Sequence, residues 1–585
     1  MTKILFINHK KSQCGVYEFG RNVGDALKLS SLEFSYHECG SGDELREIAT
    51  QQTPDAIIYN YHPATMRWLS AGITRNIRCP QIGIIHEVTQ TVADRANNSL
   101  FNFHIAHDPT LLLKNPIVFK AGRLIPQYEN KFTGPEIPVI GSFGFAGKKG
   151  QRRLVELVQK EFDEAVIRIN IPFATFGDAR GEMAMAIAEE CRAALTKPNI
   201  KLELTHDFLG QKELLDFIAQ NTINLFLYEP MDDEHRGISG VVDLALAVNR
   251  PVGITQQKMF RHIESAFPKI CIENNSVKEI VNNGTRPLDR FYREWSAENL
   301  CWDYKRIVAN VFSRKDIPRI ANPLISRTKR FIKRKLRIPD ANSQPVWITG
   351  DVTATAMRVT YNTSHYKPAD IPHERPLNNI LDDEARELYR ETIAQMFEFL
   401  PELMSRKIAE ANVQQAFVLD TVYNFASEIS EPKILCVGSF EDSASASLKL
   451  LGFETDEIDP MINYDLATFL TKPTTKLNSY EIILSTSVIE HVEHDEEFVT
   501  QIASLLQIGG KAVLTCDFND NFKPGDPKPV VDHRLYTQKD IRERLMSRIP
   551  NCRLVDEPLW NCPNPDFWFE GVNYTFASIV FEKTK

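Results

Sequence analysis

The chain has 585 residues, of which 43% are hydrophobic and 25% charged, so it has the composition of a soluble globular protein and is too long for one hydrophobic core. The 68 Lys and Arg residues against 77 Asp and Glu residues leave a formal net charge of −9. This balance excludes the strongly basic surface expected of a nucleic-acid-binding protein.

The 10 cysteines form neither a CxxC pair nor a His/Cys cluster with zinc-ligand spacing, so we expect no metal site and a reduced, cytoplasmic setting. The amino terminus MTKILFINHKK has too short an apolar core for a signal peptide, and we interpret it as a buried strand. No apolar run approaches the roughly 20 residues that a membrane-spanning helix needs.

Residues 1–320 alternate short apolar strands with helical segments, which predicts two α/β halves. The segment 131–138, KFTGPEIP, separates the halves and is typical of an interdomain connection. We therefore predict two Rossmann-like lobes, 1–130 and 131–320, that face a cleft. The predicted strands are Ile4–Asn8, Ala56–Asn60, Gln81–His86, Phe103–Ala106, Val139–Phe143, Ala165–Ile171, Lys201–Thr205 and Ile223–Tyr228.

Residues 321–380 are interpreted as a basic hinge followed by a linker. The run 326–337, SRTKRFIKRKLR, is dense in Lys and Arg around Phe331, Ile332 and Leu336. As a helix it suits either peripheral contact with an anionic membrane, at the inner face, or a solvated position between domains. The sequence favours neither interpretation.

Residues 381–430 have the apolar spacing of helices, and 431–585 is again α/β. Within the latter we predict a strand at Lys433–Gly438, a helix at Ala444–Leu451 and a strand at Phe453–Ile458. The stretch from Tyr480 to Phe518 predicts a strand, a loop, an amphipathic helix, a turn at Gly509–Gly510 and a second strand ending at Asp517. Such parallel units bind ligands beyond the carboxyl ends of their strands.

The phrases KILCVG, EIDP and SVIEHV, followed by GG, occur in the order that resembles class I S-adenosylmethionine-dependent methyltransferases. The resemblance implies S-adenosylmethionine as cofactor, with Gly438 allowing a close approach and Asp459 binding the ribose hydroxyls. The sequence departs from the family where G-x-G-x-G is reduced to GSFED and where Cys436 replaces an acid. The candidate cofactor-binding residues are Gly438, Ser439, Glu441, Asp459, Asp465, Ser487 and Glu490.

A hydroxyl acceptor of a methyl group needs a base, and His491, His533 and Asp517 are the candidate catalytic residues of this domain. The alternatives stay open: Glu490 as a cap of the next helix, His491 as a packed side chain and Arg534 as a structural residue. Trp560, Phe567 and Trp568 are either core residues or the wall of a pocket.

The first 320 residues resemble GT-B glycosyltransferases, which use nucleotide-activated sugars. The resemblance is carried by KKSQCGVYEFGRNV, by a strand ending in His86, by IGSFGFAGKKGQRRLVELV, and by DDEHRGISGVVDLALAVNRPVGI. A final helix, Phe291–Phe312, resembles the family's helix that crosses back to the first lobe. The resemblance implies a catalytic role for His86 and nucleotide-sugar binding by Gly15, Lys148, Lys149, Arg236, Gly237, Ser239 and Asp243.

The sequence lacks the two glutamates that retaining members carry. His235 and Asp243 stand at their positions, or Arg236 and Leu244 if the register slips by one. We expect the stretch Gly237–Gly240 to cradle phosphate through backbone amides and the Ser239 hydroxyl. The pair Asp232–Asp233 is interpreted as a solvated turn.

The sequence thus predicts an α/β protein in which two Rossmann-like GT-B lobes precede a helical linker region and a class I methyltransferase domain. The predicted function is that of a bifunctional glycosyltransferase and methyltransferase that O-methylates a sugar in surface glycan biosynthesis. Its partners would be a nucleotide-sugar donor and a glycan or sugar acceptor. One alternative is a methyltransferase whose GT-B part is a non-catalytic glycan- or nucleotide-binding module. A weaker alternative is a methyltransferase for a small molecule or protein, with the first lobes serving assembly.

Overall fold

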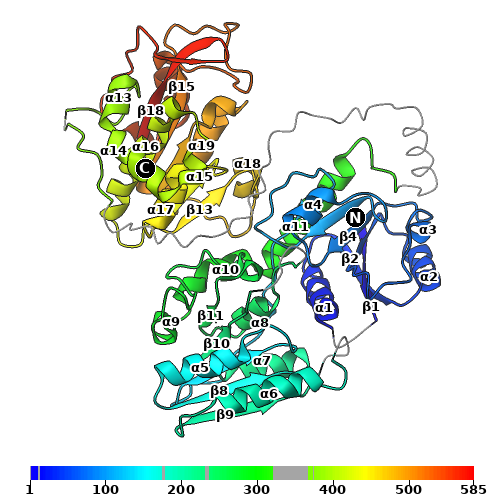
Figure 1. Ribbon diagram of the computed structural model, residues 1–585. Coiled ribbons are helices and arrows are strands. Elements are labelled where there is room, and N and C mark those ends of the chain that lie inside the picture. Colours follow the sequence, from blue (N-terminus) through cyan, green and yellow to red (C-terminus); the bar gives the residue numbers. More distant parts are fainter. Residues whose placement is uncertain (1, 11–13, 174–177, 231–235, 321–365, 373) are drawn as a thin grey trace, which may run out of the picture. The chain divides into compact units, whose positions relative to one another are not determined.

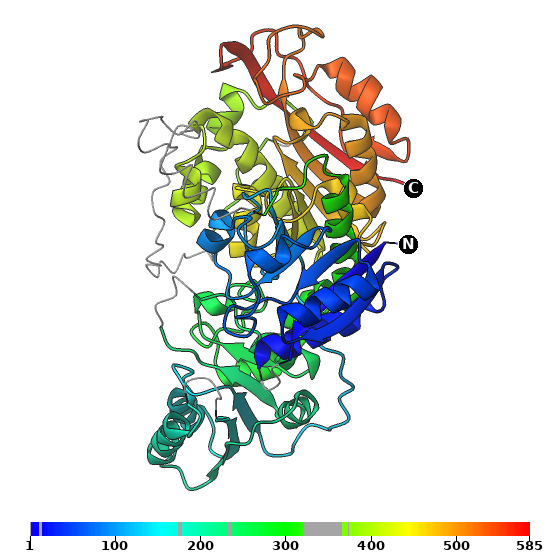
Figure 2. The same cartoon turned by 90° about the vertical axis from the view of Figure 1, so that its right-hand side faces the viewer.

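The computed structural model describes residues 2–10, 14–173, 178–230, 236–320, 366–372 and 374–585 (Figures 1 and 2). The chain divides into two compact units, Met1–Asp340 and Ala341–Lys585. The basic run 326–337, most of the predicted linker, Asp232–Asp233 and His235 lie outside the described residues. Among the described residues, no helix has the length and apolar character needed to cross a membrane.

The first sheet of the first unit has six parallel strands in the order β2-β1-β3-β4-β5-β6. Helices α1 and α11 cover one face, and α2 covers the other. Because β1 has β2 on one side and β3 on the other, the chain reverses its winding direction there, and sheets of this kind bind ligands at the carboxyl ends of the strands that flank such a reversal. The elements are β1 (Lys3–His9), α1 (Gly15–Leu27), β2 (Glu33–Cys39), α2 (Gly42–Gln52), β3 (Ala56–Tyr59), α3 (Ala71–Thr74), β4 (Gln81–Ile85), α4 (Gln90–Arg95), β5 (Phe103–Ala106) and β6 (Val118–Lys120).

The second sheet of this unit has five parallel strands in the order β11-β10-β7-β8-β9. Helices α5, α6 and α9 cover one face, and α7, α8 and α10 cover the other (Figure 1). The winding direction reverses between β7 and β10. The elements are β7 (Val139–Phe143), α5 (Gln151–Glu161), β8 (Ala165–Asn170), α6 (Glu182–Ala194), β9 (Ile200–Thr205), α7 (Gln211–Ala219), β10 (Ile223–Phe226), α8 (Val241–Ala247), β11 (Val252–Ile254), η2 (Lys258–Phe260), α9 (Val277–Asn283), η3 (Arg286–Leu288), α10 (Asp289–Glu294) and α11 (Ala297–Ser313).

The predicted closing helix consists of two helices, α10 and α11. The break follows from Ser296, whose side chain accepts a hydrogen bond from the Asn299 N–H and caps α11. Phe291 and Trp295 pack into the core of the second lobe, whereas Tyr304 packs into the core of the first. The segment therefore crosses back to the first lobe, as predicted.

The second unit begins with a helical region that the apolar spacing predicted. Its elements are α13 (Asp383–Leu388), α14 (Arg390–Phe399), α15 (Pro401–Met404), η5 (Ala409–Ala411) and α16 (Asn412–Ser427). Helices α14, α16 and α17 cover one face of the following sheet, and α18 and α19 cover the other.

That sheet has seven strands in the order β13-β12-β14-β15-β18-β16, with β17 paired to β18. Strands β12 to β15 are parallel, β18 is antiparallel to β15, and the winding direction reverses between β12 and β14. The elements are β12 (Ile434–Val437), α17 (Ser443–Leu450), β13 (Thr455–Ile458), α18 (Leu466–Leu470), β14 (Tyr480–Thr486), η6 (Ile489–His491), α19 (Asp495–Leu505), β15 (Leu506–Phe518), η7 (Asp540–Leu545), η8 (Met546–Arg548), β16 (Cys552–Leu554), β17 (Phe567–Phe569) and β18 (Val572–Lys583).

The predicted turn at Gly509–Gly510 is wrong, since both glycines lie within β15. The register between β14 and β15 shifts from Tyr480↔Leu506 to Ile482↔Lys511, so the glycines lie in a bulge and Gly509 has φ of 80°. The three sheets, each flanked by helices, give the α/β fold class that the sequence predicted.

Candidate functional sites

A glycine-containing loop follows β7 at the point where the second sheet reverses direction. Gly144, Gly147 and Gly150 all have positive φ, and a Cβ on Gly150 would lie 1.9 Å from the Leu227 carbonyl oxygen. Only glycine fits there, because the loop lies against the backbone that follows β10. This contact positions the two lysines of the loop beside the carboxyl end of β10.

Lys149 occupies this loop with its ammonium nitrogen 3.6 Å from the centre of the Tyr228 ring. Burial, and to a lesser extent the nearby Arg236, lowers the pKa of Lys149 to about 8. Among the described residues no carboxylate is paired with this ammonium. A partly buried cation without a carboxylate beside it favours the binding of an anion. Its neighbour Lys148 is exposed, with Nζ 3.4 Å from the Pro230 carbonyl.

The predicted phosphate cradle is only partly available. The Ser239 N–H donates to the Met259 carbonyl, and the Ser239 hydroxyl bonds to Tyr228 Oη at 3.1 Å. Ser239 therefore cannot offer its amide to a phosphate, contrary to the sequence expectation, because the local backbone already uses it. Arg236 is exposed and has a free approach to solvent.

Gly237 is a point of close approach between the two lobes. A Cβ at this position would lie 2.7 Å from Cα of Glu87, the residue after His86. The segment before α8 therefore packs directly on the backbone that follows β4. This contact brings the carboxyl edges of the two sheets together within the first unit.

At the edge of the first sheet, polar side chains from three strands form a chain of hydrogen bonds. Asn60 Nδ2 donates to Asn8 Oδ1 at 2.8 Å, and the His86 Nε2 lies 2.7 Å from Asn60 Oδ1. Because the amide oxygen only accepts, the His86 Nε2 carries the proton. Desolvation lowers the pKa of His86 to about 3, so this imidazole is neutral.

Gly15 begins α1 with no atom within 4 Å of a built Cβ, and sterics do not require glycine there.

Asp243 is occupied by an interlobe ion pair. Its Oδ1 accepts from Arg123 Nε at 3.1 Å and its Oδ2 from Arg123 Nη2, while Arg123 Nη1 donates to the His107 carbonyl. Both side chains are buried, with 7% and 9% exposure. Both oxygens of Asp243 are thus bonded to Arg123, which leaves this carboxylate no free oxygen for the nucleotide sugar that the sequence analysis assigns to it.

In the second unit, the loop after β12 and the acid after β13 are joined. Gly438 has φ of 83°, and a Cβ there would lie 2.3 Å from Val488 Cγ2. Asp459 Oδ2 accepts from the Phe440 N–H at 3.3 Å, and its Oδ1 accepts from the Met461 N–H at 2.7 Å. The partly exposed carboxylate is therefore fixed at the carboxyl end of β13, beside the loop that follows β12.

The remaining candidate cofactor residues differ in their surroundings. Ser439 is buried and its hydroxyl has no hydrogen-bond partner among the described residues. Glu441 pairs with Arg406 at 2.9 Å. Asp465 is exposed and caps α18 by accepting from the Thr468 N–H. Cofactor contact by Glu441 and Asp465 is therefore not supported by their present bonds, whereas the unpartnered hydroxyl of Ser439 fits a polar ligand.

Three buried acids gather at the carboxyl ends of β14 and β15. Glu490, Asp517 and Asp532 are each no more than 5% exposed. Burial raises the pKa of Glu490 to about 7 and that of Asp517 well above its usual value, and each charge opposes the others. Ser487 donates to Glu490 Oε1 at 2.6 Å, whereas Glu490 Oε2 has no partner among the described residues. Glu490 is not the cap of α19, because its side chain faces this buried cluster.

His491 is the histidine that the structure orients. Its Nδ1 lies 3.0 Å from Asp532 Oδ1, and this contact raises the pKa of His491. The side chain is 42% exposed. His533 is exposed and contributes only its N–H, which donates to the Glu490 carbonyl, while Arg534 pairs with Asp495. Of the two histidine candidates, His491 alone among the described contacts has a carboxylate partner.

The three aromatic candidates, Trp560, Phe567 and Trp568, differ in their exposure to solvent. Trp560 and Phe567 are core residues, with 1% and 4% exposure, whereas Trp568 is 69% exposed. The core interpretation holds for the first two and fails for Trp568.

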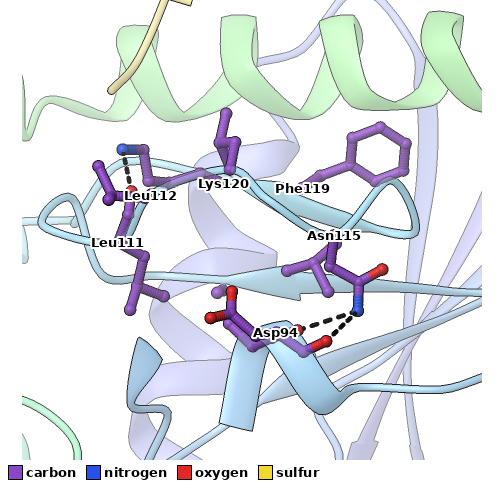
Figure 3. A pocket seen from close by; sticks show the side chains of 10 residues that line it. Asp94, Leu111, Leu112, Asn115, Phe119 and Lys120 are labelled. Carbon is purple, nitrogen blue, oxygen red and sulfur yellow. Dashed lines mark hydrogen bonds between the residues drawn. The ribbon is translucent and has the colours of Figure 1, made fainter. Parts of the chain in front are cut away.

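A small cavity lies in the first lobe between α4 and the strands β5 and β6 (Figure 3). Its volume is about 10 Å³, room for a single water. Lys120 beside it donates to the Leu111 carbonyl, and Asn115 donates to the Asp94 carbonyl. This cavity cannot hold a nucleotide or a sugar.

No protein-family model matches the chain, and no curated protein matches it. Solved structures similar to its first part include a glycosyltransferase from Rickettsia africae, with 12% identity, coverage of 58% of this chain and 99% of that chain, and a TM-score of 0.34. Trehalose-6-phosphate synthase OtsA has 10% identity, coverage of 47% and 75%, and a TM-score of 0.32. A Burkholderia thailandensis N1-methyltransferase, solved with S-adenosylhomocysteine, has 13% identity, coverage of 37% and 94%, and a TM-score of 0.24. These scores are too low to support an argument, and the fold assignment rests on the sheet order above.

Proposed function

We propose that the chain is a bifunctional transferase. The first unit transfers a sugar from a nucleotide-activated donor to a glycan or sugar acceptor, and the second O-methylates a sugar with S-adenosylmethionine. The observation that carries this proposal is the position of the unsatisfied polar groups. Lys149 in the first unit, and Ser439 and Glu490 in the second, lie where their sheets reverse direction.

In the first unit, Lys149 and Arg236 supply positive charge for a diphosphate. The amino terminus of α5 follows Gly150 directly and adds the partial positive charge of its unpaired N–H groups. The donor provides a sugar whose leaving group is a nucleoside diphosphate, and these cations stabilise the charge that develops on it. Lys148 is a second, exposed contributor.

His86 is proposed to position the acceptor. With its Nε2 proton held by Asn60, the imidazole presents Nδ1 as a hydrogen-bond acceptor for a hydroxyl. Its pKa of about 3 makes it a weak base, so we assign it orientation of the acceptor more than proton removal.

In the second unit, Gly438, Ser439 and Asp459 would hold S-adenosylmethionine. The bound sulfonium supplies an electrophilic methyl group, whose bond to sulfur breaks as the acceptor oxygen bonds to carbon. His491 takes the hydroxyl proton on Nε2, since Asp532 holds Nδ1–H. Asp532 then stabilises the imidazolium that results, and the protonated Glu490 and Asp517 can donate hydrogen bonds to the acceptor's other oxygens.

One observation favours the alternative of a non-catalytic first unit. Both oxygens of Asp243 bond to Arg123, and the family's two glutamates are absent. Under that alternative, the first unit binds a nucleotide or glycan without turning it over. The cytoplasmic location and the contact of 326–337 with an anionic membrane remain proposals from the sequence.

The test uses the full chain in two assays: release of nucleoside diphosphate from a panel of nucleotide sugars, and formation of S-adenosylhomocysteine. Lys149→Ala should abolish the first activity, and His491→Ala the second. The exposed Lys160, at the far end of α5, and the exposed His494 provide matched control substitutions to Ala. Nucleotide binding without release by the wild-type chain would establish the binding module instead. Absence of S-adenosylhomocysteine formation would contradict the methyltransferase.

A further inference from the structure

The β17–β18 hairpin extends beyond the sheet at its ligand-binding edge. Strand β18 pairs with β15 as far as Phe518↔Thr575, and β17 pairs with the part of β18 before Thr575. The turn Glu570–Gly571 has φ values of 49° and 83°, as a tight two-residue hairpin requires. The hairpin tip therefore overhangs the carboxyl end of β15, the end at which Asp517 lies.

This hairpin carries an exposed tryptophan, and a loop with two exposed valines is hydrogen-bonded to its tip. Trp568 is 69% exposed, and Val530 and Val531 are 84% and 66% exposed. The Val530 N–H donates to Glu570 Oε2 at 2.8 Å, which fixes the valine loop to the hairpin tip. We call Trp568, Val530 and Val531 the apolar ridge. Large exposed apolar groups gathered in this way are typical of a binding surface.

The apolar ridge is continuous with the proposed catalytic pair. Val531 directly precedes Asp532, and its backbone hydrogen-bonds the His491 imidazole. The valine loop is therefore joined to His491 through its backbone. No other exposed tryptophan occurs among the large exposed hydrophobic residues of the described chain.

The negative charge around His491 limits which class of methyl acceptor can bind beside it. Burial, and with it the nearby charge of Asp532, raises the pKa values of Glu490 and Asp517, so the site disfavours additional negative charge. A diphosphate placed beside this cluster would add like charge in a region with little solvent. A neutral saccharide adds none, and its hydroxyls can bond to protonated and ionised carboxyls alike.

From these relationships we propose that the apolar ridge binds the methyl acceptor, and that the acceptor is an uncharged saccharide, not a nucleotide-activated sugar. The apolar C–H face of a sugar ring suits the flat face of Trp568, which leaves the ring hydroxyls free to reach His491. Glycosyl transfer must then supply the substrate for methylation, and methylation follows it. This inference rests on the proposed methyltransferase function.

The test starts from cells that produce the His491→Ala variant, in which unmethylated acceptor accumulates. Their extract is separated into saccharide, sugar-nucleotide, lipid and small-amine fractions. Each fraction is incubated with the full wild-type chain and methyl-tritiated S-adenosylmethionine. We expect tritium in the saccharide fraction. Label in the sugar-nucleotide or amine fraction would overturn the inference and leave the methyltransferase standing.

A second arm tests the apolar ridge with the labelled saccharide as substrate. Trp568→Ala should raise KM by about tenfold or more, with kcat and the Kd for S-adenosylmethionine unchanged. The control is Ile508→Ala, which removes a residue that is 68% exposed in the β14–β15 bulge, at the opposite end of β15. Equal KM values for the two variants would contradict a role for the ridge.

Sedimentation of both variants tests the alternative that the apolar ridge binds a second copy of the chain. Concentration-dependent association that is lost in Trp568→Ala, with KM unchanged, would show that the ridge is a self-association surface and overturn the proposal. If no fraction is labelled although the chain binds S-adenosylmethionine, the proposed methyltransferase function itself fails.

Discussion

Lys149 lies with its ammonium nitrogen 3.6 Å from the centre of the Tyr228 ring, at the sheet edge where the winding direction reverses between β7 and β10. The aromatic face stabilises the cation only in part, and burial lowers its pKa to about 8. An anion that enters this edge therefore gains a charge-assisted hydrogen bond without breaking an existing ion pair among the described residues. This relationship is the physical basis for expecting a diphosphate here.

The affinity of the first unit for a nucleoside diphosphate should depend on pH. Since the ligand pairs with protonated Lys149, and free Lys149 loses its proton above about 8, affinity should fall roughly tenfold per pH unit above that value. Calorimetric titration of the full chain between pH 7 and pH 10 measures this decline.

Lys149→Arg should remove the decline, because guanidinium stays protonated throughout this range. If the wild type keeps a constant affinity from pH 7 to pH 10, Lys149 does not contact the anion.

Replacing only one partner of the Arg123–Asp243 ion pair should lower the stability of the first unit. Asp243→Asn leaves the buried Arg123 guanidinium without its counter-charge, which should destabilise the first unit by about 3–5 kcal/mol. Urea unfolding, followed by hydrogen exchange of peptides from α8, reports this unit within the full chain. Arg123→Met combined with Asp243→Leu should recover much of the loss. A single Asn variant as stable as the wild type would show that the pair contributes nothing.

Methyl transfer should rise with pH through the pKa of His491, because the neutral imidazole is the form that accepts a proton. Asp532 raises this pKa above the ordinary value of 6.5. In Asp532→Asn the midpoint should therefore move to lower pH, while His491→Ala should lower kcat by about 10²–10⁴-fold. His494→Ala is the matched control. A pH profile that does not change in Asp532→Asn would contradict the proposed base.

The second unit should lose stability as pH rises through the range in which Glu490 titrates. An unfolded glutamate ionises near 4.5, whereas the folded Glu490 retains its proton to about 7, so the folded state binds more protons between these values. The free energy of unfolding therefore decreases from pH 4.5 to pH 7. Hydrogen exchange of β15 peptides at pH 5 and pH 8 measures this slope after correction for intrinsic exchange rates. Glu490→Gln should flatten it, and an unchanged slope would exclude Glu490 as its source.

Most of the fold could be predicted from apolar runs, but the two edge strands of the first sheet, β2 and β6, could not. The run Val139–Phe143 is apolar because β7 is central and covered on both faces. Strand β2, Glu33–Cys39, was missed because it lies at the edge of its sheet and alternates charged and apolar side chains. The bulge at Gly509 was taken for a turn, since both need a residue with positive φ.

The candidate sites were predicted residue by residue, without their partners. Lys149 follows a glycine turn and was identified from it, but nothing near Tyr228 in sequence links that ring to the lysine. The resemblance assigns Asp243 to the nucleotide sugar from its position alone, whereas its partner Arg123 lies 120 residues away in sequence and could not be inferred. Asn60, which fixes the proton of His86, ends a strand at the same sheet edge, and that position was the signal that could have identified it.

The most direct test of a chain with two working sites is calorimetric titration of the full protein with S-adenosylmethionine and with a panel of nucleoside diphosphates. We expect saturable binding of both classes, with loss of S-adenosylmethionine binding alone in Asp459→Ala and of nucleotide binding alone in Lys149→Ala. Binding of S-adenosylmethionine without any nucleotide would contradict the donor site. Failure to bind S-adenosylmethionine would contradict the methyltransferase.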